Sequence, residues 1–156
     1  MASLGKGTRV SKVSEETIED LFPNLRKDSY FIASPETINY NCIAWAAGNG
    51  EKWWWPDPQS QYFWPPGIPR EETIEAFVKA YEILGYSICQ NAEYENGFEK
   101  IAVYVDSIGR PTHAARQLIS GRWTSKLGGL EDIEHTLDGL AGSKYGNVAI
   151  IMKRFR

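Results

Sequence analysis

The stretch that decides the fold is EKIAVYVDSIGRPTHAARQLISGRWTSKL, residues 99–127. Three segments of it, 99–106, 112–118 and 123–127, have no helical periodicity and favour strands. Two short turns, each containing glycine, separate these segments. Because connections this short join neighbouring strands that run in opposite directions, the stretch predicts an antiparallel sheet.

The flanking segments complete the predicted fold. Alanine-rich or amphipathic patterns and turn residues predict helices at 14–22, 42–47, 69–84 and 131–140, and further strands at 86–90 and 147–152. We therefore expect one α+β domain over residues 14–156, with N-terminal helices packed on a C-terminal antiparallel sheet of about five strands. Residues 1–13 are expected to form a flexible tail.

Charge and hydropathy exclude several classes of protein. The 156-residue chain has a net charge of −3 and a pI near 5.5, so we expect no nucleic-acid partner. No apolar run reaches the ~18 residues of a membrane-spanning helix, and residues 1–13 lack the apolar stretch of a secretory signal. The sequence therefore predicts a soluble protein, cytoplasmic as synthesised and without a membrane partner; delivery by a dedicated secretion system stays open.

The cysteine and histidine content argues against a metal site. Two residues of each type are present, without a Cys-x-x-Cys motif or a histidine pair at metal-ligand spacing. A disulfide between Cys42 and Cys89 is disfavoured in a reducing compartment. Cys89 lies in a predicted strand, and we interpret it as a packing residue.

Cys42 is the first candidate for chemistry, because it is expected in the first turn of a buried helix. The free N–H groups and the helix dipole at that end stabilise a thiolate and lower its pKa. A nucleophile also needs a base, and His113, at the start of a predicted strand, is the candidate. Ser125 on the next strand could orient the imidazole. The alternative is that Cys42 and His113 are ordinary buried residues.

Two motifs carry a resemblance to a known family: NCIAWA at 41–46 and PTHAAR at 111–116. They resemble motifs of the papain-like cysteine hydrolases, especially the compact bacterial CHAP and NlpC-type amidases. Together with GRWTSKLG at 121–128, they look like an uncharacterised bacterial domain family over residues 20–153. The resemblance implies that the α+β domain is papain-like, that the cysteine of the first motif, Cys42, is the nucleophile, and that the histidine of the second, His113, is the base.

The remaining catalytic positions depart from the family pattern. Papain-like enzymes usually carry Asn, Asp, His or Glu as the third residue, whereas Ser125 offers a hydroxyl, so Asp106 and His135 are alternative orienting groups. The oxyanion hole would combine the backbone N–H of the nucleophile with a side-chain amide. The candidates for that amide are Asn41 and Asn39, each of which could instead be only a helix cap.

Residues 53–66 are rich in tryptophan and proline and cannot form a regular helix. We interpret most of this segment as a structural loop, with one or two rings lining a cleft beside the nucleophile; a wall that stacks on sugars or peptides is the alternative. Cationic residues near the predicted site could bind a substrate carboxylate, or could be solvated charges. The candidate substrate-binding residues are Trp45, Trp54, Trp64, Arg116 and Lys126.

These observations favour a cysteine hydrolase or acyltransferase that attacks an amide bond of a peptide- or peptidoglycan-like substrate and needs no cofactor. The alternatives are a catalytically silent member of the fold that binds a peptide, glycan or protein, and a delivered effector or toxin domain. An activated Cys42 should be alkylated at neutral pH before Cys89.

Overall fold

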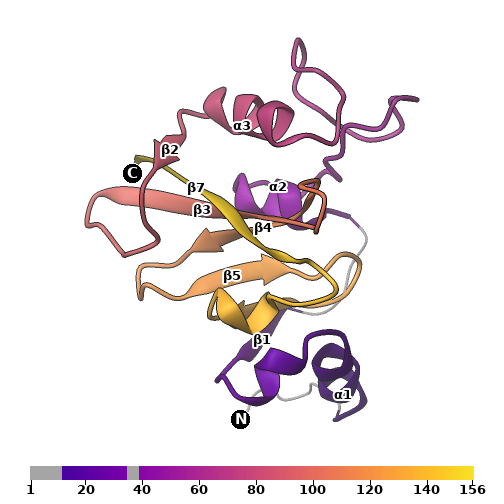
Figure 1. Cartoon of the computed structure of the whole chain (residues 1–156), viewed down its shortest axis with the longest axis vertical. Coiled ribbons are helices and arrows are strands. Elements are labelled where there is room, and N and C mark those ends of the chain that lie inside the picture. The colour runs from indigo at the N-terminus through magenta and orange to yellow at the C-terminus, as the bar shows by residue number, and fades with distance from the viewer. Residues whose placement is uncertain (1–11, 35–38) are drawn as a thin grey trace.

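The computed structural model describes residues 12–34 and 39–156. Residues 1–11 of the predicted tail lie outside the described residues, and residues 12 and 13 already belong to the first helix. The architecture is a seven-stranded sheet in the order β1-β6-β5-β4-β3-β7-β2, with antiparallel pairing throughout (Figure 1). The strands are β1 (Phe31–Ser34), β2 (Ser87–Cys89), β3 (Phe98–Val105), β4 (Pro111–Gln117), β5 (Trp123–Lys126), β6 (Asp132–His135) and β7 (Asn147–Phe155).

The expected α+β, papain-like fold with helices on a five-stranded sheet is wrong, because the described chain is largely β. Its helices are short: α1 (Lys12–Leu21), α2 (Cys42–Ala46), α3 (Ile74–Glu82) and the 3-10 turns η1 (Pro23–Arg26) and η2 (Asp138–Leu140). Strand β1 comes from the N-terminal half and pairs with β6, so helices and strands are not segregated along the chain. The hairpins predicted around the two short turns are confirmed by the β3–β4 and β4–β5 pairings.

The helix predicted at 131–140 is instead strand β6 followed by η2. Asp132, Ile133 and His135 are fully buried and Glu134 is partly buried, so both faces of this segment are covered, unlike a helix that buries one face. Cross-strand pairing places Ile133 opposite Ser125 of β5. The tertiary pairing on both sides of β6 therefore overrides the local helical signal.

Two other helices begin at residues that differ from the prediction. Helix α3 begins at Ile74 and not at Pro69, because the Thr73 hydroxyl caps it by accepting a hydrogen bond from the Ala76 N–H at 3.2 Å. Helix α1 already begins at Lys12, so Ser14 lies inside the helix and is not its N-cap. Within the described residues, every helix is too short or too polar to cross a membrane.

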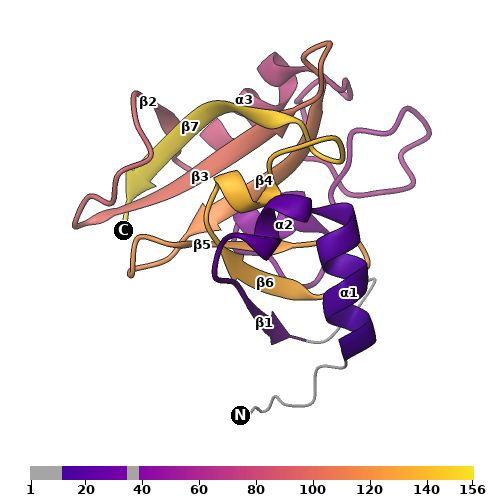
Figure 2. The same cartoon turned by 60° about the horizontal axis from the view of Figure 1, so that its bottom comes forward.

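The two faces of the sheet are buried by different elements. In Figures 1 and 2, α3 lies at the end of the sheet that holds β2 and β7, and α1 lies at the end that holds β1 and β6. Residues of α2, α3 and the tryptophan-rich loop pack with Ala114 of β4, whereas residues of α1, η1 and η2 pack with its neighbour Ala115. Successive side chains of β4 thus enter opposite cores.

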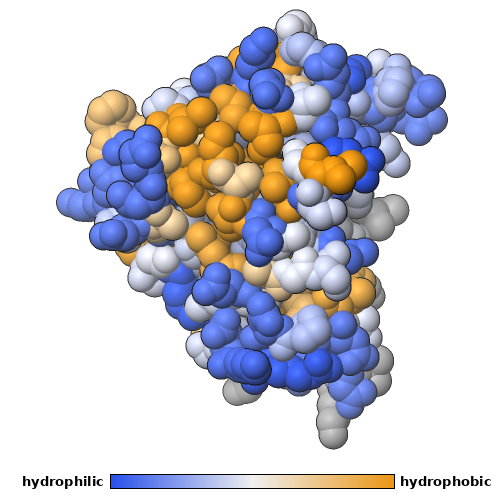
Figure 3. Space-filling model, in the orientation of Figure 1, coloured by the Kyte–Doolittle hydropathy of each residue, from blue (hydrophilic) through white to orange (hydrophobic). Residues whose placement is uncertain are grey.

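Apolar residues also reach the surface on one part of the molecule. Figure 3 shows them gathered on the upper half of the view, whereas the lower half is mostly polar. Ile83, at the end of α3, and Ile88 of β2 are 55% and 52% exposed. Neither isoleucine belongs to the two buried cores.

Candidate functional site

Three buried polar side chains from three neighbouring strands meet on one face of the sheet. His113 comes from β4, Ser125 from β5 and His135 from β6, and all three are fully buried. The Ser125 hydroxyl lies 2.9 Å from His113 Nε2 and 2.7 Å from His135 Nε2. On its other side, His135 Nδ1 lies 2.6 Å from the Thr136 carbonyl oxygen. The predicted orienting group Ser125 and the alternative His135 therefore belong to one hydrogen-bonded chain.

Aromatic rings enclose the His113 imidazole. Tyr145 stacks on it with ring centroids 4.0 Å apart and an interplanar angle of 9°, and Tyr104 meets it edge-on at 5.4 Å. Burial, with a smaller contribution from His135, holds the pKa of His113 well below its usual range. Burial also lowers the pKa of His135 to about 4. Both imidazoles are therefore neutral near pH 7.

A tight loop holds Tyr145 against the imidazole. Its backbone is bridged between Gly142 and Gly146, and the Thr112 hydroxyl donates to the Tyr145 carbonyl at 2.5 Å. Gly146 has a φ of +79°, and a Cβ there would lie 1.8 Å from the carbonyl oxygen of Val105. Only glycine therefore allows this loop to approach the end of β3 so closely.

Cys42 begins α2, and Asn41 is the N-cap of that helix. The Asn41 side-chain oxygen accepts from the N–H groups of Ala44 at 3.2 Å and Trp54 at 3.0 Å, and its Nδ2 donates to the Trp54 carbonyl at 2.6 Å. The amide considered for the oxyanion hole is therefore engaged in capping and in fixing the tryptophan-rich loop. Asn39 is exposed.

The Cys42 thiol is buried, and the expectation of a lowered pKa is wrong. Burial raises the pKa of Cys42 to about 11, although the N–H groups of Ala114 and Ile43 and the charge of Lys126 favour the thiolate. Desolvation of the anion outweighs these N–H groups and the nearby cation. A neutral thiol is thus the resting state near pH 7.

The thiol and the imidazole approach β4 from opposite faces of the sheet. Cys42 packs in the core that includes Ala114, whereas the adjacent His113 contacts Tyr104 and Tyr145 of the other core. The pairing of β4 with β5 ends at Arg116, so the strands are unpaired beside Ala114. No described side chain, Cys42 included, makes a hydrogen bond with His113 Nδ1.

A second polar group lies on the face of the sheet that carries Cys42. Lys126 is fully buried, and its ammonium donates to the carbonyls of Gly128 and Leu130, each at 2.5 Å. Tyr40 donates to Asp132, which is paired with Lys126 across β5 and β6. Lys126 is therefore an internal cation whose charge stabilises a thiolate at Cys42, and not a solvated charge.

The other predicted substrate-binding residues differ in exposure. Trp54 and Trp64 are 6% and 4% exposed and belong to the core, so in this structure their rings do not form a surface wall. Trp45 is partly exposed; its indole N–H donates to the Thr124 hydroxyl at 3.3 Å, and the Arg116 guanidinium lies 4.6 Å from its ring centre. Trp45 and Arg116 are thus stacked together beside α2.

Two pockets lie at opposite ends of the hydrogen-bonded chain formed by His113, Ser125 and His135. One, of about 370 Å³, is lined by Tyr145, Thr112 and charged residues of both signs, among them Asp106. Asp106 accepts from backbone N–H groups of its own turn and pairs with Arg110 at 3.1 Å, so it does not orient His113. The other pocket, of about 360 Å³, includes Thr136.

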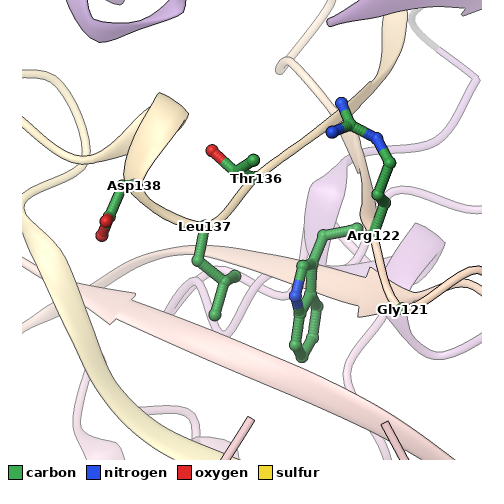
Figure 4. A pocket seen from close by; sticks show the side chains of 6 residues that line it. Gly121, Arg122, Thr136, Leu137 and Asp138 are labelled. Atoms are coloured by element: carbon green, nitrogen blue, oxygen red, sulfur yellow. The ribbon is translucent and has the colours of Figure 1, made fainter. Parts of the chain in front are cut away.

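The pocket that includes Thr136 is shown in Figure 4. Arg122 and Asp138 stand at its opposite ends, with Thr136 and Leu137 between them. Among the residues that the structure describes, neither pocket nor any other region gathers three or more His, Cys, Asp or Glu side chains that could hold a metal ion.

The fold and the site together define an antiparallel β-sheet domain with a buried thiol and a Ser-bridged pair of histidines. The chain belongs to the family described as a domain of unknown function (DUF7689), which matches residues 31–153. Membership of an uncharacterised domain family is thereby confirmed, and nothing in the comparison connects that family to papain-like hydrolases. No curated protein and no solved structure matches the chain.

Sequence reasoning missed Tyr145 and gave His135 only a secondary role. The alternation of Asp132, Ile133, Glu134 and His135 is a strand pattern that could have placed His135 beside Ser125. Tyr145 lies between glycines in a turn, and no periodicity there indicates which side chain it contacts.

Proposed function

We propose that this domain is a cysteine hydrolase or acyltransferase that acts on an amide bond, with Cys42 as the nucleophile and His113 as its base. The observation that carries the proposal is an unpartnered ring nitrogen on His113: its Nε2 is engaged by Ser125, and its Nδ1 is buried without a hydrogen-bond partner among the described residues. A buried polar atom without a partner is costly, and a catalytic role is one explanation for its presence. The resemblance to papain-like hydrolases supports these two roles only and does not extend to the fold.

Tyr145 connects the two proposed catalytic groups. Its ring stacks on His113, its pKa is raised mainly by burial and further by the nearby Cys42, and it lines the pocket of about 370 Å³. Cys42 and His113 are buried and do not line this pocket, so a substrate bound there would reach them only past Tyr145. The pocket carries Glu72 and Lys144 as well as the Asp106–Arg110 pair, which suits a substrate with charges of both signs, such as a peptide.

The proposed reaction starts from neutral groups. Because the two groups lie on opposite faces of the sheet, the proton transfer requires a route between β4 and β5 beside Ala114, where these strands are unpaired. By that route the Cys42 thiol proton passes to His113 Nδ1 while the sulfur attacks the amide carbon, because the raised pKa of the thiol disfavours a resting ion pair. The C–N bond then breaks, the amine leaves with the proton from Nδ1, and a thioester remains. Water, or an acceptor amine in a transferase, gives its proton to Nδ1 and displaces the sulfur, which regains the proton.

A binding module is the second candidate. Its support is the burial of the thiol and its pKa of about 11, since both reduce the reactivity of Cys42 in the absence of substrate. In that case the partly exposed Trp45 with Arg116 above it would be the better recognition surface.

Formation of an acyl-enzyme distinguishes the two candidates. We would incubate a Cys89→Ser variant with p-nitrophenyl acetate at pH 7.5 and follow acetylation of Cys42 by intact mass and peptide mapping. The hydrolase proposal expects Cys42 to be acetylated, and His113→Ala to slow the reaction by about 10²-fold or more, as loss of a general base does. Amide substrates would then be screened with peptides of mixed charge.

Two further variants serve as controls for the acetylation experiment. Cys42→Ala in the Cys89→Ser background should show no acetylation, and Glu82→Gln, at an exposed position of α3, should leave the rate within about threefold. Acetylation of Cys42 at the same rate with and without His113 would contradict the proposal and favour the binding module.

The proposed cellular setting is the reducing cytoplasm. Cys42 and Cys89 are both free thiols, which suits such a compartment. The proposed partner is a peptide- or amide-containing substrate, with no nucleic acid or membrane; a delivered effector domain is the alternative setting.

A further inference from the structure

We infer that His135 is a positioning residue that, through Ser125, fixes the tautomer of His113 with the proton on Nε2 and leaves Nδ1 as a proton acceptor. Its consequence for catalysis rests on the proposed function, but the tautomer itself does not.

Thr136 sets the direction of the first hydrogen bond. A carbonyl oxygen only accepts, so the contact of 2.6 Å with the Thr136 carbonyl requires a proton on His135 Nδ1. In the neutral imidazole, His135 Nε2 is then an acceptor. Thr136 is itself held, because its hydroxyl donates to Asp28 at 2.8 Å and accepts from the Gly139 N–H at 3.1 Å. The end of the hydrogen-bonded chain at Thr136 is therefore fixed in position.

Ser125 then determines which nitrogen of His113 carries the proton. Its hydroxyl has one proton, and the acceptor at His135 Nε2, 2.7 Å away, takes it. The contact of 2.9 Å with His113 can then form only if His113 Nε2 carries a proton and donates to the Ser125 oxygen. A neutral His113 protonated on Nε2 has its lone pair on Nδ1, which is the nitrogen without a described partner.

Removal of the acceptor at position 135 should reverse the direction of the hydrogen bond between Ser125 and His113. In His135→Phe the Ser125 hydroxyl has no acceptor there, so it can donate to His113 Nε2 instead and move the His113 proton to Nδ1. His135→Gln is the matched variant, because its side-chain oxygen reaches the position of the imidazole Nε2 and can still accept from Ser125. The two variants thus differ in whether the acceptor is present.

The test is the ¹⁵N chemical-shift and coupling pattern of the His113 ring at pH 7.5 in the full chain. We expect a proton on Nε2 in the wild type and in His135→Gln, and a proton on Nδ1 in His135→Phe. If His113 in the wild-type protein carries its proton on Nδ1, the inference is overturned, whatever the variants do. Should His135→Phe fail to fold, Ser125→Ala provides the second variant: with the connecting hydroxyl gone, the wild-type preference for Nε2 should weaken.

Acetylation of Cys42 measured on the same proteins separates this inference from the proposed function. If both are correct, the rate falls on the order of 10²-fold in His135→Phe and recovers to within about tenfold in His135→Gln, because a wrong tautomer removes the base. If the tautomer changes in His135→Phe while Cys42 is never acetylated, the positioning role stands and the hydrolase proposal fails. A tautomer that stays on Nε2 in a folded His135→Phe overturns the positioning role.

Discussion

Tyr145 lies flat against His113, with ring centroids 4.0 Å apart and planes only 9° from parallel. Two flat rings in this arrangement fix the plane of the imidazole, while its hydrogen bond to Ser125 fixes the rotation within that plane. The orientation of His113 therefore depends on a residue 32 positions later in the chain, held by a loop that closes on glycine.

Replacement of the stacking ring should destabilise the domain. Tyr145→Ala removes a buried ring from the core that contains Ala115 and Tyr104, and we expect the free energy of unfolding to fall by about 3 kcal/mol or more. Tyr145→Phe keeps the ring and should cost about 1 kcal/mol or less. Urea unfolding at pH 7.5 measures both variants, and equal losses would show that the stacked ring contributes little.

Stability should fall as the pH drops from about 6.5 toward 4. An unfolded histidine binds its proton near pH 6.5, whereas burial lowers the pKa of His135 to about 4 in the folded protein, so acid favours the unfolded state over this window. The shift corresponds to about 3 kcal/mol for His135, and the lowered pKa of His113 acts in the same direction. Urea unfolding across this range checks the trend.

Comparison with His135→Gln isolates the histidine contribution from that of the carboxylates. Carboxylates titrate in both proteins, so only the difference between wild type and variant reports His135. We expect the stability advantage of the wild type at pH 7.5 to shrink by about 2 kcal/mol or more at pH 4.5. A difference that is the same at both values would contradict a lowered pKa at His135.

Iodoacetamide should modify Cys89 before Cys42, the reverse of the expectation from sequence. Cys89 is partly exposed at the end of β2, whereas Cys42 is buried and its pKa is raised to about 11. Alkylation at pH 7.5 followed by peptide mapping gives the order. In 6 M guanidinium the two cysteines should react at similar rates, which serves as the control; faster labelling of Cys42 in the folded protein would indicate an accessible thiolate.

Loss of the Asn41 side chain should unfold or loosen the start of α2. Asn41→Ala removes the helix cap and leaves the buried N–H and carbonyl of Trp54 without their partner, which should cost about 3 kcal/mol. Gln59→Ala, at an exposed position of the same loop, should change stability by less than about 0.5 kcal/mol. Thermal and urea unfolding compare the two, and a neutral Asn41→Ala would mean that the cap is dispensable.

The sequence correctly predicted those elements that are specified by neighbouring residues alone, namely two hairpins and one helix cap. The hairpins around 107–110 and 119–122 follow from short glycine-containing turns between apolar segments, and both are present. An asparagine cap before Cys42 also follows from local chemistry, since a side-chain oxygen beside free N–H groups needs no distant partner; the sequence left Asn39 and Asn41 as candidates, and the cap is Asn41. These features are determined within about ten residues.

Elements stabilised by distant partners were misassigned. Strand β1 is four residues long and exists because β6 pairs with it, and β6 is a strand because β1 and β5 flank it, so neither has a decisive signal of its own. The helical interpretation of 131–140 followed from local propensity, which weighs less than hydrogen bonding on both edges of a strand. The seven-stranded sheet is a consequence of such long-range pairings.

The sequence by itself determined which chemical groups are present: one thiol at a helix start, two histidines, and a serine on a strand next to His113. Only the tertiary structure decided their state. Burial, which depends on packing from the whole chain, raises the pKa of Cys42 and lowers that of His113, opposing the effect expected from the helix terminus. Strand order likewise brings His135 next to Ser125, because the alternation of side chains places every second residue of β4, β5 and β6 on one face.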